Sequence, residues 1–134
     1  MAIFRNPQVV LFAGDVERSV SFYSALGFEE VFRTPTEGVP IHVDLVLDGY
    51  RIGLASVEST RVDHGLDPVT DGQRAAVILW SDDTRSALAE LGAHGATVLA
   101  EPYEWLGRLL IAWAADPEGT PIQIVQELTP RRPE

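Results

Sequence analysis

The same order of expected secondary-structure elements occurs twice in the chain. Each half shows a strand pattern, then a helix pattern with a polar capping residue before it and a glycine after it, then three strand patterns. The first set covers residues 8–13, 14–28, 29–34, 42–48 and 50–57, and the second covers residues 74–80, 81–95, 96–102, 107–114 and 121–127. A repeated β-α-β-β-β order predicts an internal duplication.

Three pairs of landmarks support the duplication by their nearly constant spacing. They are the helix-capping Asp15 and Asp82 (67 residues apart), Gly27 and Gly95 at the helix ends (68 apart), and the Asp48-Gly49 and Glu118-Gly119 turns (70 apart). The two halves share few other residues, so the order of the elements carries this inference more than sequence identity does.

Each repeated unit contains one helix, which can cover only one face of its sheet. The sequence therefore predicts a single α+β domain of two paired βαβββ modules, whose curved sheets form a half-barrel around a cleft. The expected bounds are about 5–56 for the first module, 57–73 for a polar connector, 74–127 for the second module and 128–134 for a frayed tail.

The composition removes several kinds of chemistry. The 134 residues include no cysteine and no lysine, which excludes disulfides, thiolate metal ligands and lysine Schiff bases. Twenty acidic residues against ten arginines give a net charge of −10, which disfavours nucleic-acid binding. The acidity has two interpretations, which are the solubility of a small protein and the attraction of a cationic small molecule.

The chain shows no sign of export or of membrane insertion. No apolar run approaches the roughly 20 residues that a membrane span needs. The N-terminal MAIFRNPQVV lacks the basic segment and the long apolar stretch of a signal peptide. We therefore expect a cytoplasmic protein that does not contact a membrane.

Two motifs resemble those of a known superfamily. The segment GDVERSVSFYSALGF, through Asp15, Ser19, Phe22 and Tyr23, and the later turn DPEG are similar to motifs of the vicinal-oxygen-chelate superfamily, and the resemblance covers roughly residues 5–127. That superfamily includes glyoxalase I, extradiol dioxygenases, fosfomycin-inactivating enzymes and bleomycin-resistance proteins. The resemblance implies the paired-module fold, which hosts enzymes and binders alike.

The resemblance also indicates where metal-dependent members carry their ligands. Those members place His or Glu on the first and last strands of each module, and the matching residues here are Gln8, Gly53, Ala75 and Gln123. Two amides, a glycine and an alanine do not supply the carboxylate or imidazole ligands that a divalent ion needs. We therefore predict no metal and no other cofactor, and we expect Gln8 and Gln123 to face each other as hydrogen-bonding residues.

His42 and Asp44 form the sequence HVD on one expected strand, so their side chains project from the same face. Strand alternation places them in the cleft, with Phe12 and Val46 as apolar walls. Three interpretations remain open: contact with a ligand, a polar pair at an oligomer interface, and acid–base catalysis without a metal. The other two histidines are expected on the solvated surface, and they are His64 and His94.

The segment EPYEWLGRLLIAWAADPEG resembles the antibiotic-binding branch of the superfamily, namely bleomycin-resistance-like and mitomycin-binding-like proteins. Tyr103 and Trp105 are expected in a loop between two strands. There they either stack on a flat heteroaromatic ligand or cap the core. Arg108 pairs either with an acidic group of the ligand or with a carboxylate of the chain.

The two other tryptophans lie on apolar strands. Compared with the related binders, the chain has an extra residue between Gly107 and Asp116, which predicts a bulge and leaves the facing of Trp113 open. We expect Trp80 and Trp113 in the core rather than in the site.

Together these observations predict a non-catalytic binder of small molecules and, through the resemblance, an antibiotic-sequestering resistance protein. The expected ligand is aromatic, and the acidic surface favours a cationic one. The alternative is a metal-independent isomerase or lyase that uses His42 and Asp44 as acid and base. The resemblance further implies a homodimer whose subunits share their clefts. The candidate ligand-binding residues are Gln8, Phe12, His42, Asp44, Val46, Tyr103, Trp105, Arg108 and Gln123.

Overall fold

A computed structural model describes residues 3, 5–73 and 75–128. The chain divides into two compact units, residues 1–71 and 72–134, and each is described here by itself. Most of the tail for which we predict fraying, residues 129–134, lies outside the described residues. None of the described helices is long and apolar enough to cross a membrane.

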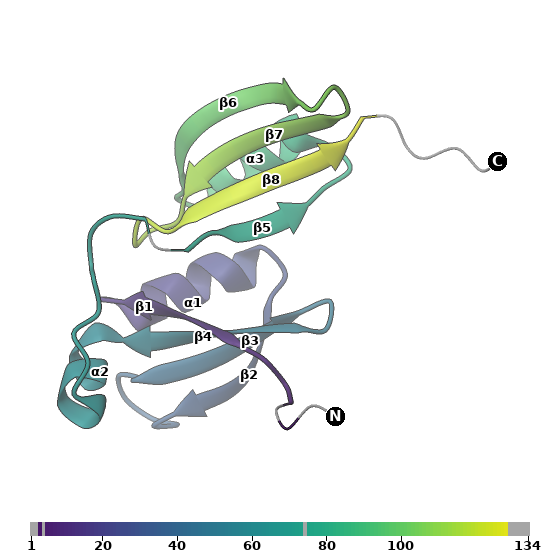
Figure 1. The fold of residues 1–134 in the computed structure, drawn as a ribbon. Coiled ribbons are helices and arrows are strands. Elements are labelled where there is room, and N and C mark those ends of the chain that lie inside the picture. The colour runs from purple at the N-terminus through teal and green to yellow at the C-terminus, as the bar shows by residue number, and fades with distance from the viewer. Residues whose placement is uncertain (1–2, 4, 74, 129–134) are drawn as a thin grey trace. The chain divides into compact units, whose positions relative to one another are not determined.

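The first unit has the expected β-α-β-β-β order (Figure 1). Its sheet has the strand order β1-β4-β3-β2, in which β1 runs parallel to β4 and the other neighbours are antiparallel. The elements are β1 (Val9–Ala13), α1 (Val16–Ala25), β2 (Glu29–Thr34), β3 (His42–Leu47) and β4 (Tyr50–Ser56). The Asp48-Gly49 hairpin is confirmed, since both residues have positive φ, as a type I′ turn requires.

Helix α1 forms because its N-terminal cap and its apolar stripe both favour a helix over the same residues. The Asp15 carboxylate accepts a hydrogen bond from the Arg18 backbone N–H at 3.0 Å, which caps the first turn. The buried face of the helix includes Phe22 and Tyr23, whose rings meet edge to face at 5.1 Å. This face packs against β3 and β4, where Leu45 and other apolar side chains are fully buried. One face of the first sheet is therefore core.

Arg33 connects β2 to α1 across this packing. Its guanidinium lies 2.9 Å from a Glu17 carboxylate oxygen and 2.8 Å from one of Glu30. Hydrogen bonds to these two carboxylates raise the pKa of Arg33, and the Arg33 side chain lowers the pKa of Glu30. The edge strand β2 is thereby tied to the helix that covers the sheet.

The second unit repeats the plan with the strand order β5-β8-β7-β6, and Figure 1 shows α3 behind its sheet. The Thr84 hydroxyl donates to the Leu110 carbonyl at 2.9 Å, and the Thr84 N–H donates to the Gln126 side chain at 2.8 Å, so the start of the helix is bonded to the sheet. The elements are β5 (Val77–Trp80), α3 (Thr84–Ala93), β6 (Thr97–Trp105), β7 (Leu109–Ala115) and β8 (Pro121–Glu127).

The residue that caps α3 is Asp83, one position after the Asp82 that the landmark spacing uses. Hydrogen bonds from the Ser86 N–H and hydroxyl hold the pKa of the Asp83 carboxyl below its usual value. The cap spacing between Asp15 and Asp83 is 68 residues, the same as that between Gly27 and Gly95. The structure therefore makes the duplication more regular than the sequence suggests.

Part of the expected connector is helical. Helix α2 (Val57–His64) begins after Ser56, whose hydroxyl accepts from the Ser59 N–H, and ends at Gly65, whose φ is +69°. It packs against β4 through Val57 and Thr60, its only two buried residues. Because so little of the helix is buried, its sequence shows no apolar period and is mostly polar.

Strand β6 differs from the expectation in two ways. It continues to Trp105, so Tyr103 and Trp105 lie on a strand and not in a loop. The bulge that we predict between Gly107 and Asp116 does not occur, because the register of β7 with β8 is continuous. The pairing shifts lie on β6 instead, twice between Val98 and Tyr103. The turn after β6 has positive φ at Leu106 (57°) and Gly107 (68°), as in a type I′ turn.

Leu106 is an unfavourable residue for this turn. A left-handed backbone is costly for leucine, and its side chain is 64% exposed and gains little from packing. We expect Leu106→Asn to stabilise the protein by about 0.5–1 kcal/mol, or roughly 2–5 °C in melting temperature, because asparagine tolerates this conformation. Thermal unfolding of Leu106→Asn and of the control Leu106→Ala measures the effect. Equal melting temperatures for the two variants would contradict it.

Candidate functional site

Each sheet has one face without a helix, and strand alternation decides which side chains lie there. On β3, Leu45 is buried against the helix, so its neighbours Asp44 and Val46 point to the other face. The register pairs Asp44 with Gly53, and Gly53 in turn with Val10. We call this face the first open face. Its residues are Gln8, Val10, Phe12, Phe32, His42, Asp44, Val46, Arg51 and Gly53.

Asp44 is the centre of a polar cluster on the first open face. Gln8 Nε2 donates to Asp44 Oδ1 at 2.6 Å, and His42 Nε2 lies 2.7 Å from the same oxygen. Arg51 Nη1 lies 3.3 Å from Asp44 Oδ2. Asp44 is 7% exposed, and its charge is stabilised by His42 on the same strand and by Gln8 and Arg51 from other segments. We call these four residues the Asp44 cluster.

The cluster explains the glycine at position 53. A Cβ there would lie 2.8 Å from Gln8 Nε2, 3.0 Å from Asp44 Oδ1 and 3.1 Å from Val10 Cγ2. The Gln8–Asp44 hydrogen bond thus occupies the space that a side chain of residue 53 would need. Residue 53 therefore has no side chain that could bind a metal, because the packing of the cluster leaves no room for one.

His42 is held in one orientation by the cluster. Because the Asp44 carboxylate only accepts hydrogen bonds, His42 Nε2 is the donor in this contact, and in the neutral imidazole Nδ1 is then the acceptor. The neighbouring Phe32 ring makes a further T-shaped contact with the imidazole, with the ring centroids 6.2 Å apart. The imidazole is partly exposed, so Nδ1 can accept a hydrogen bond or a proton from a bound molecule.

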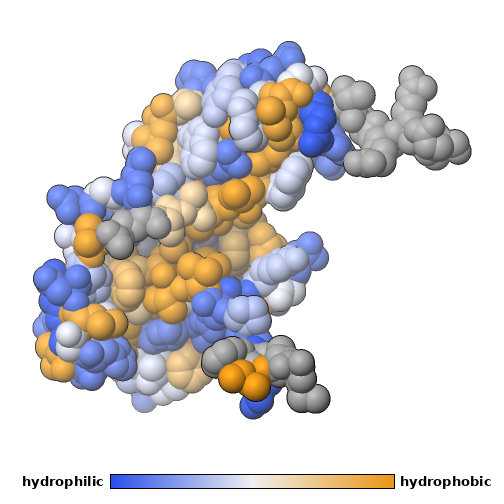
Figure 2. Space-filling model, in the orientation of Figure 1, coloured by the Kyte–Doolittle hydropathy of each residue, from blue (hydrophilic) through white to orange (hydrophobic). Residues whose placement is uncertain are grey.

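The open face of the second sheet has a different character. Trp80, Trp113 and Tyr103 point to it, since they pair in register with Val125, Gln123 and Ile111. In Figure 2, orange hydrophobic patches lie among polar ones on the visible side of the second unit. We call the open face of this sheet the second open face. Its residues are Ile78, Trp80, Ala100, Tyr103, Trp105, Leu109, Ile111, Trp113, Gln123 and Val125.

Trp113 and Tyr103 are joined on this face by a hydrogen bond of 3.0 Å from the indole Nε1–H to the tyrosine hydroxyl oxygen. Trp113 also packs on the buried cluster of Leu109, Ile111 and Val125. The indole is therefore fixed on one side by apolar contact and at its edge by a hydrogen bond.

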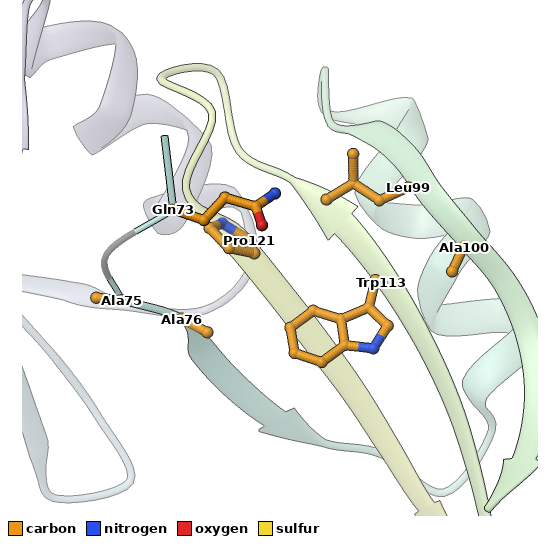
Figure 3. A pocket seen from close by; sticks show the side chains of 7 residues that line it. All are labelled: Gln73, Ala75, Ala76, Leu99, Ala100, Trp113 and Pro121. Carbon is orange, nitrogen blue, oxygen red and sulfur yellow. The ribbon is translucent and has the colours of Figure 1, made fainter. Parts of the chain in front are cut away.

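A pocket of about 520 Å³ opens beside Trp113. Figure 3 shows the indole extending from β7 toward β8, with Leu99 and Ala100 of β6 on the opposite side of the pocket. Leu99 is the extra residue at the first shift of the β6 register, and such a bulge redirects side chains. The lining residues are Gln73, Ala75, Ala76, Leu99, Ala100, Trp113 and Pro121.

The shared topology allows the two open faces to be compared position by position. Asp44 pairs with Gly53 as Trp113 pairs with Gln123, so the centre of the polar cluster and the central tryptophan are equivalent. Gly53 pairs with Val10 and Gln123 pairs with Ile78. Gln8 lies two residues before Val10, and the residue two before Ile78 is Ala76. Ala76, and not Ala75, is therefore the counterpart of Gln8. The difference of one residue arises because the sequence alignment of the two halves uses Asp82, whereas the capping residue is Asp83.

The residues at the metal-ligand positions of the fold do not fit a divalent ion. They are Gln8 and Gly53 in the first unit and Ala76 and Gln123 in the second, and none offers a carboxylate or an imidazole. Among the described residues, no three His, Asp or Glu side chains are grouped so that they could hold a metal. We therefore propose no metal-dependent reaction for this site.

The structure places the remaining sequence-predicted residues as follows. Phe12 and Val46 lie on the first open face, as alternation predicts. Arg108 lies 3.7 Å from Glu127, and both side chains are largely exposed. The expectation of a core position is wrong for Trp80, which is 68% exposed, because β5 is an edge strand with no neighbour on its outer side.

Sequence reasoning missed Arg51 of the Asp44 cluster and all the residues that line the pocket, including Trp113, for which the sequence predicts a core position. Arg51 is the second residue of β4, and its parity with Gly53 would have placed it beside Asp44. Leu99 left no comparable signal, because a bulge inside β6 changes the alternation on which such an assignment depends.

Gly53→Ala tests the packing of the cluster. The new methyl group must displace the Gln8 amide and strain Asp44, so we expect a loss of about 1–2 kcal/mol in the free energy of unfolding. The control is Gly92→Ala in α3, where nothing lies within 4 Å of the added Cβ. That change should stabilise by about 0.5–1 kcal/mol. Urea unfolding measures both, and a Gly53→Ala protein as stable as the wild type would refute the packing argument.

Comparisons with known structures support the fold. A hypothetical protein from S. aureus matches with a TM-score of 0.79 and 19% identity, over 93% of this chain and 95% of the other. A glyoxalase/bleomycin resistance protein/dioxygenase family enzyme from Burkholderia phytofirmans PsJN matches with a TM-score of 0.78 and 24% identity, over 90% and 97%. TioX from Micromonospora sp. ML1 matches with a TM-score of 0.70 and 21% identity, over 93% and 100%.

At these identities the structural matches show a shared fold and nothing about ligands. No curated protein sequence matches the chain significantly. The family model of the glyoxalase/bleomycin resistance protein/dioxygenase superfamily matches residues 5–124, which is most of the chain. This match confirms the superfamily resemblance seen in the sequence motifs, and the chain belongs to the glyoxalase/bleomycin resistance protein/dioxygenase superfamily.

Proposed function

We propose that the protein binds an aromatic small molecule on the second open face without converting it. The observation that carries this proposal is the pocket of about 520 Å³ beside Trp113. Its volume lies within the range of roughly 300–1,000 Å³ that is usual for ligand sites. Its lining is mostly apolar, and Trp113 supplies a flat surface for stacking.

Three further aromatic residues on the second open face, outside the lining of the pocket, support a planar ligand. Trp80, Tyr103 and Trp105 are all exposed on the same face as Trp113, with 68%, 42% and 52% of their surface accessible. Exposed aromatic rings that gather on one face are unusual for a soluble surface and mark a binding surface. Stacking on such rings also favours cations, and the net charge of −10 acts in the same direction.

We further propose that the ligand is an antibiotic and that binding sequesters it. The sequence support is the likeness of the segment 101–119 to the antibiotic-binding branch of the superfamily. The metal-ligand positions, which hold amides, glycine and alanine, fit a binder better than a metal-dependent enzyme. A homodimer and a cytoplasmic location complete this proposal.

Trp113→Ala and Trp105→Ala test the stacking surface. We expect each to weaken the binding of an aromatic antibiotic by about 1–3 kcal/mol, because a stacking partner is lost. The control is Tyr50→Ala, an exposed aromatic residue at the β3–β4 turn of the first unit. Thermal-shift screening with bleomycin-type and quinoxaline-type compounds finds the ligand, and titration calorimetry measures its affinity. If no compound raises the melting temperature, or if both tryptophan variants bind normally, the proposal fails.

A second candidate function rests on the contact of 2.7 Å between His42 Nε2 and Asp44 Oδ1. This geometry orients a base, so an isomerase or lyase that needs no metal is the alternative. We expect a bound compound to be recovered unchanged after long incubation, as judged by mass spectrometry. A product that forms with the wild type and not with His42→Gln would establish the alternative instead. Metal analysis of the purified protein is the third check, and a stoichiometric divalent ion would contradict both candidates.

A further inference from the structure

We infer that Tyr103 determines ligand specificity by donating its hydroxyl proton to an acceptor atom at the edge of an aromatic ligand that lies on Trp113. The inference rests on the proposed function and names the class of ligand, which is a planar heterocycle with a ring nitrogen or a carbonyl oxygen at its edge. It goes beyond stacking on Trp113, because stacking needs no acceptor atom at the edge of the ligand.

The direction of the Trp113–Tyr103 hydrogen bond leads to this inference. The indole Nε1–H is a donor only, so in the contact of 3.0 Å the tyrosine oxygen must accept. The hydroxyl proton of Tyr103 is then available for a different acceptor. Within residues 3, 5–73 and 75–128, the structure shows no acceptor for that proton. The side chain is 42% exposed, so a bound molecule can reach it.

The hydrogen bond also makes Tyr103 a better donor. A hydroxyl whose oxygen accepts a hydrogen bond is polarised, and its own O–H bonds more strongly to the next acceptor. Because the indole holds the oxygen, the hydroxyl is also fixed beside the ring on which the ligand is proposed to lie. The Tyr103 hydroxyl therefore contacts the edge of a ligand whose face stacks on Trp113.

The fold does not require a tyrosine at this position. In the first unit, Thr34 pairs with His42 as Tyr103 pairs with Ile111, so Thr34 is the equivalent residue. The first sheet forms with threonine there. The aromatic hydroxyl is therefore a feature of the second open face and not of the repeated unit.

The experiment compares two soluble probes that differ in one atom. They are the trimethylammonium derivatives (quinolin-6-yl)methyl-trimethylammonium and (naphthalen-2-yl)methyl-trimethylammonium, which have equal charge and nearly equal shape. We expect the wild type to bind the quinoline about three to ten times more tightly, the usual worth of one net hydrogen bond. In Tyr103→Phe the preference should fall to about one, while the naphthalene probe binds as before. The control Tyr50→Phe should keep the wild-type preference.

Each outcome has a definite meaning. If Tyr103→Phe still prefers the quinoline, or if the wild type binds both probes equally, the inference about Tyr103 is wrong and the binding function stands. If the wild type binds neither probe at millimolar concentration, the result counts against both proposals. The indole N–H signal of Trp113 in the proton NMR spectrum should shift in Tyr103→Phe and not in Tyr50→Phe. An unchanged signal would show that the hydrogen bond is absent in solution, which also overturns the inference.

Discussion

Each four-stranded sheet is covered by a single long helix, and this imbalance determines where the chain can bind a molecule. Helix α1 buries one face of the first sheet and α3 one face of the second, and the register then assigns every other side chain to the uncovered face. A face without a helix exposes apolar and polar groups together. The Asp44 cluster and the pocket beside Trp113 both lie on such faces.

The two units have the same backbone arrangement, but their open faces carry different kinds of side chains. Asp44 and Trp113 occupy equivalent positions, yet one is a nearly buried carboxylate with three donors and the other is a flat aromatic surface. The strand pairing does not depend on these side chains, since both sheets have the same strand order and the same parallel pair. The two open faces were therefore free to diverge while the fold stayed the same.

Much of the fold could be predicted because the signals are local. A capping aspartate, an apolar stripe and a glycine define α1, and the Asp48-Gly49 pair defines the β3–β4 turn. Helix α2 was not predicted because only Val57 and Thr60 are buried, so the apolar period is missing. The length of β6 was not predicted either, because bulges interrupt its alternation before Tyr103.

The site was predicted in part, for a related reason. Strand parity alone places His42 and Asp44 on one face, but the contacts that hold Asp44 come from Gln8 and Arg51 on other strands or segments. That Gln8 and Gln123 face each other stays a prediction, because the two units are described separately. The facing of Trp113 became clear only from its pairing with Gln123.

The sequence by itself determined the repeated order of elements, the superfamily motifs and the lack of metal-binding side chains at the ligand positions, since all of these depend on residue type and spacing along the chain. The tertiary structure decided which side chains meet. Sheet pairing brings residues from distant segments within hydrogen-bond distance, and a single bulge reverses the facing of a strand. The Asp44 cluster, the Trp113–Tyr103 hydrogen bond and the pocket all follow from that pairing.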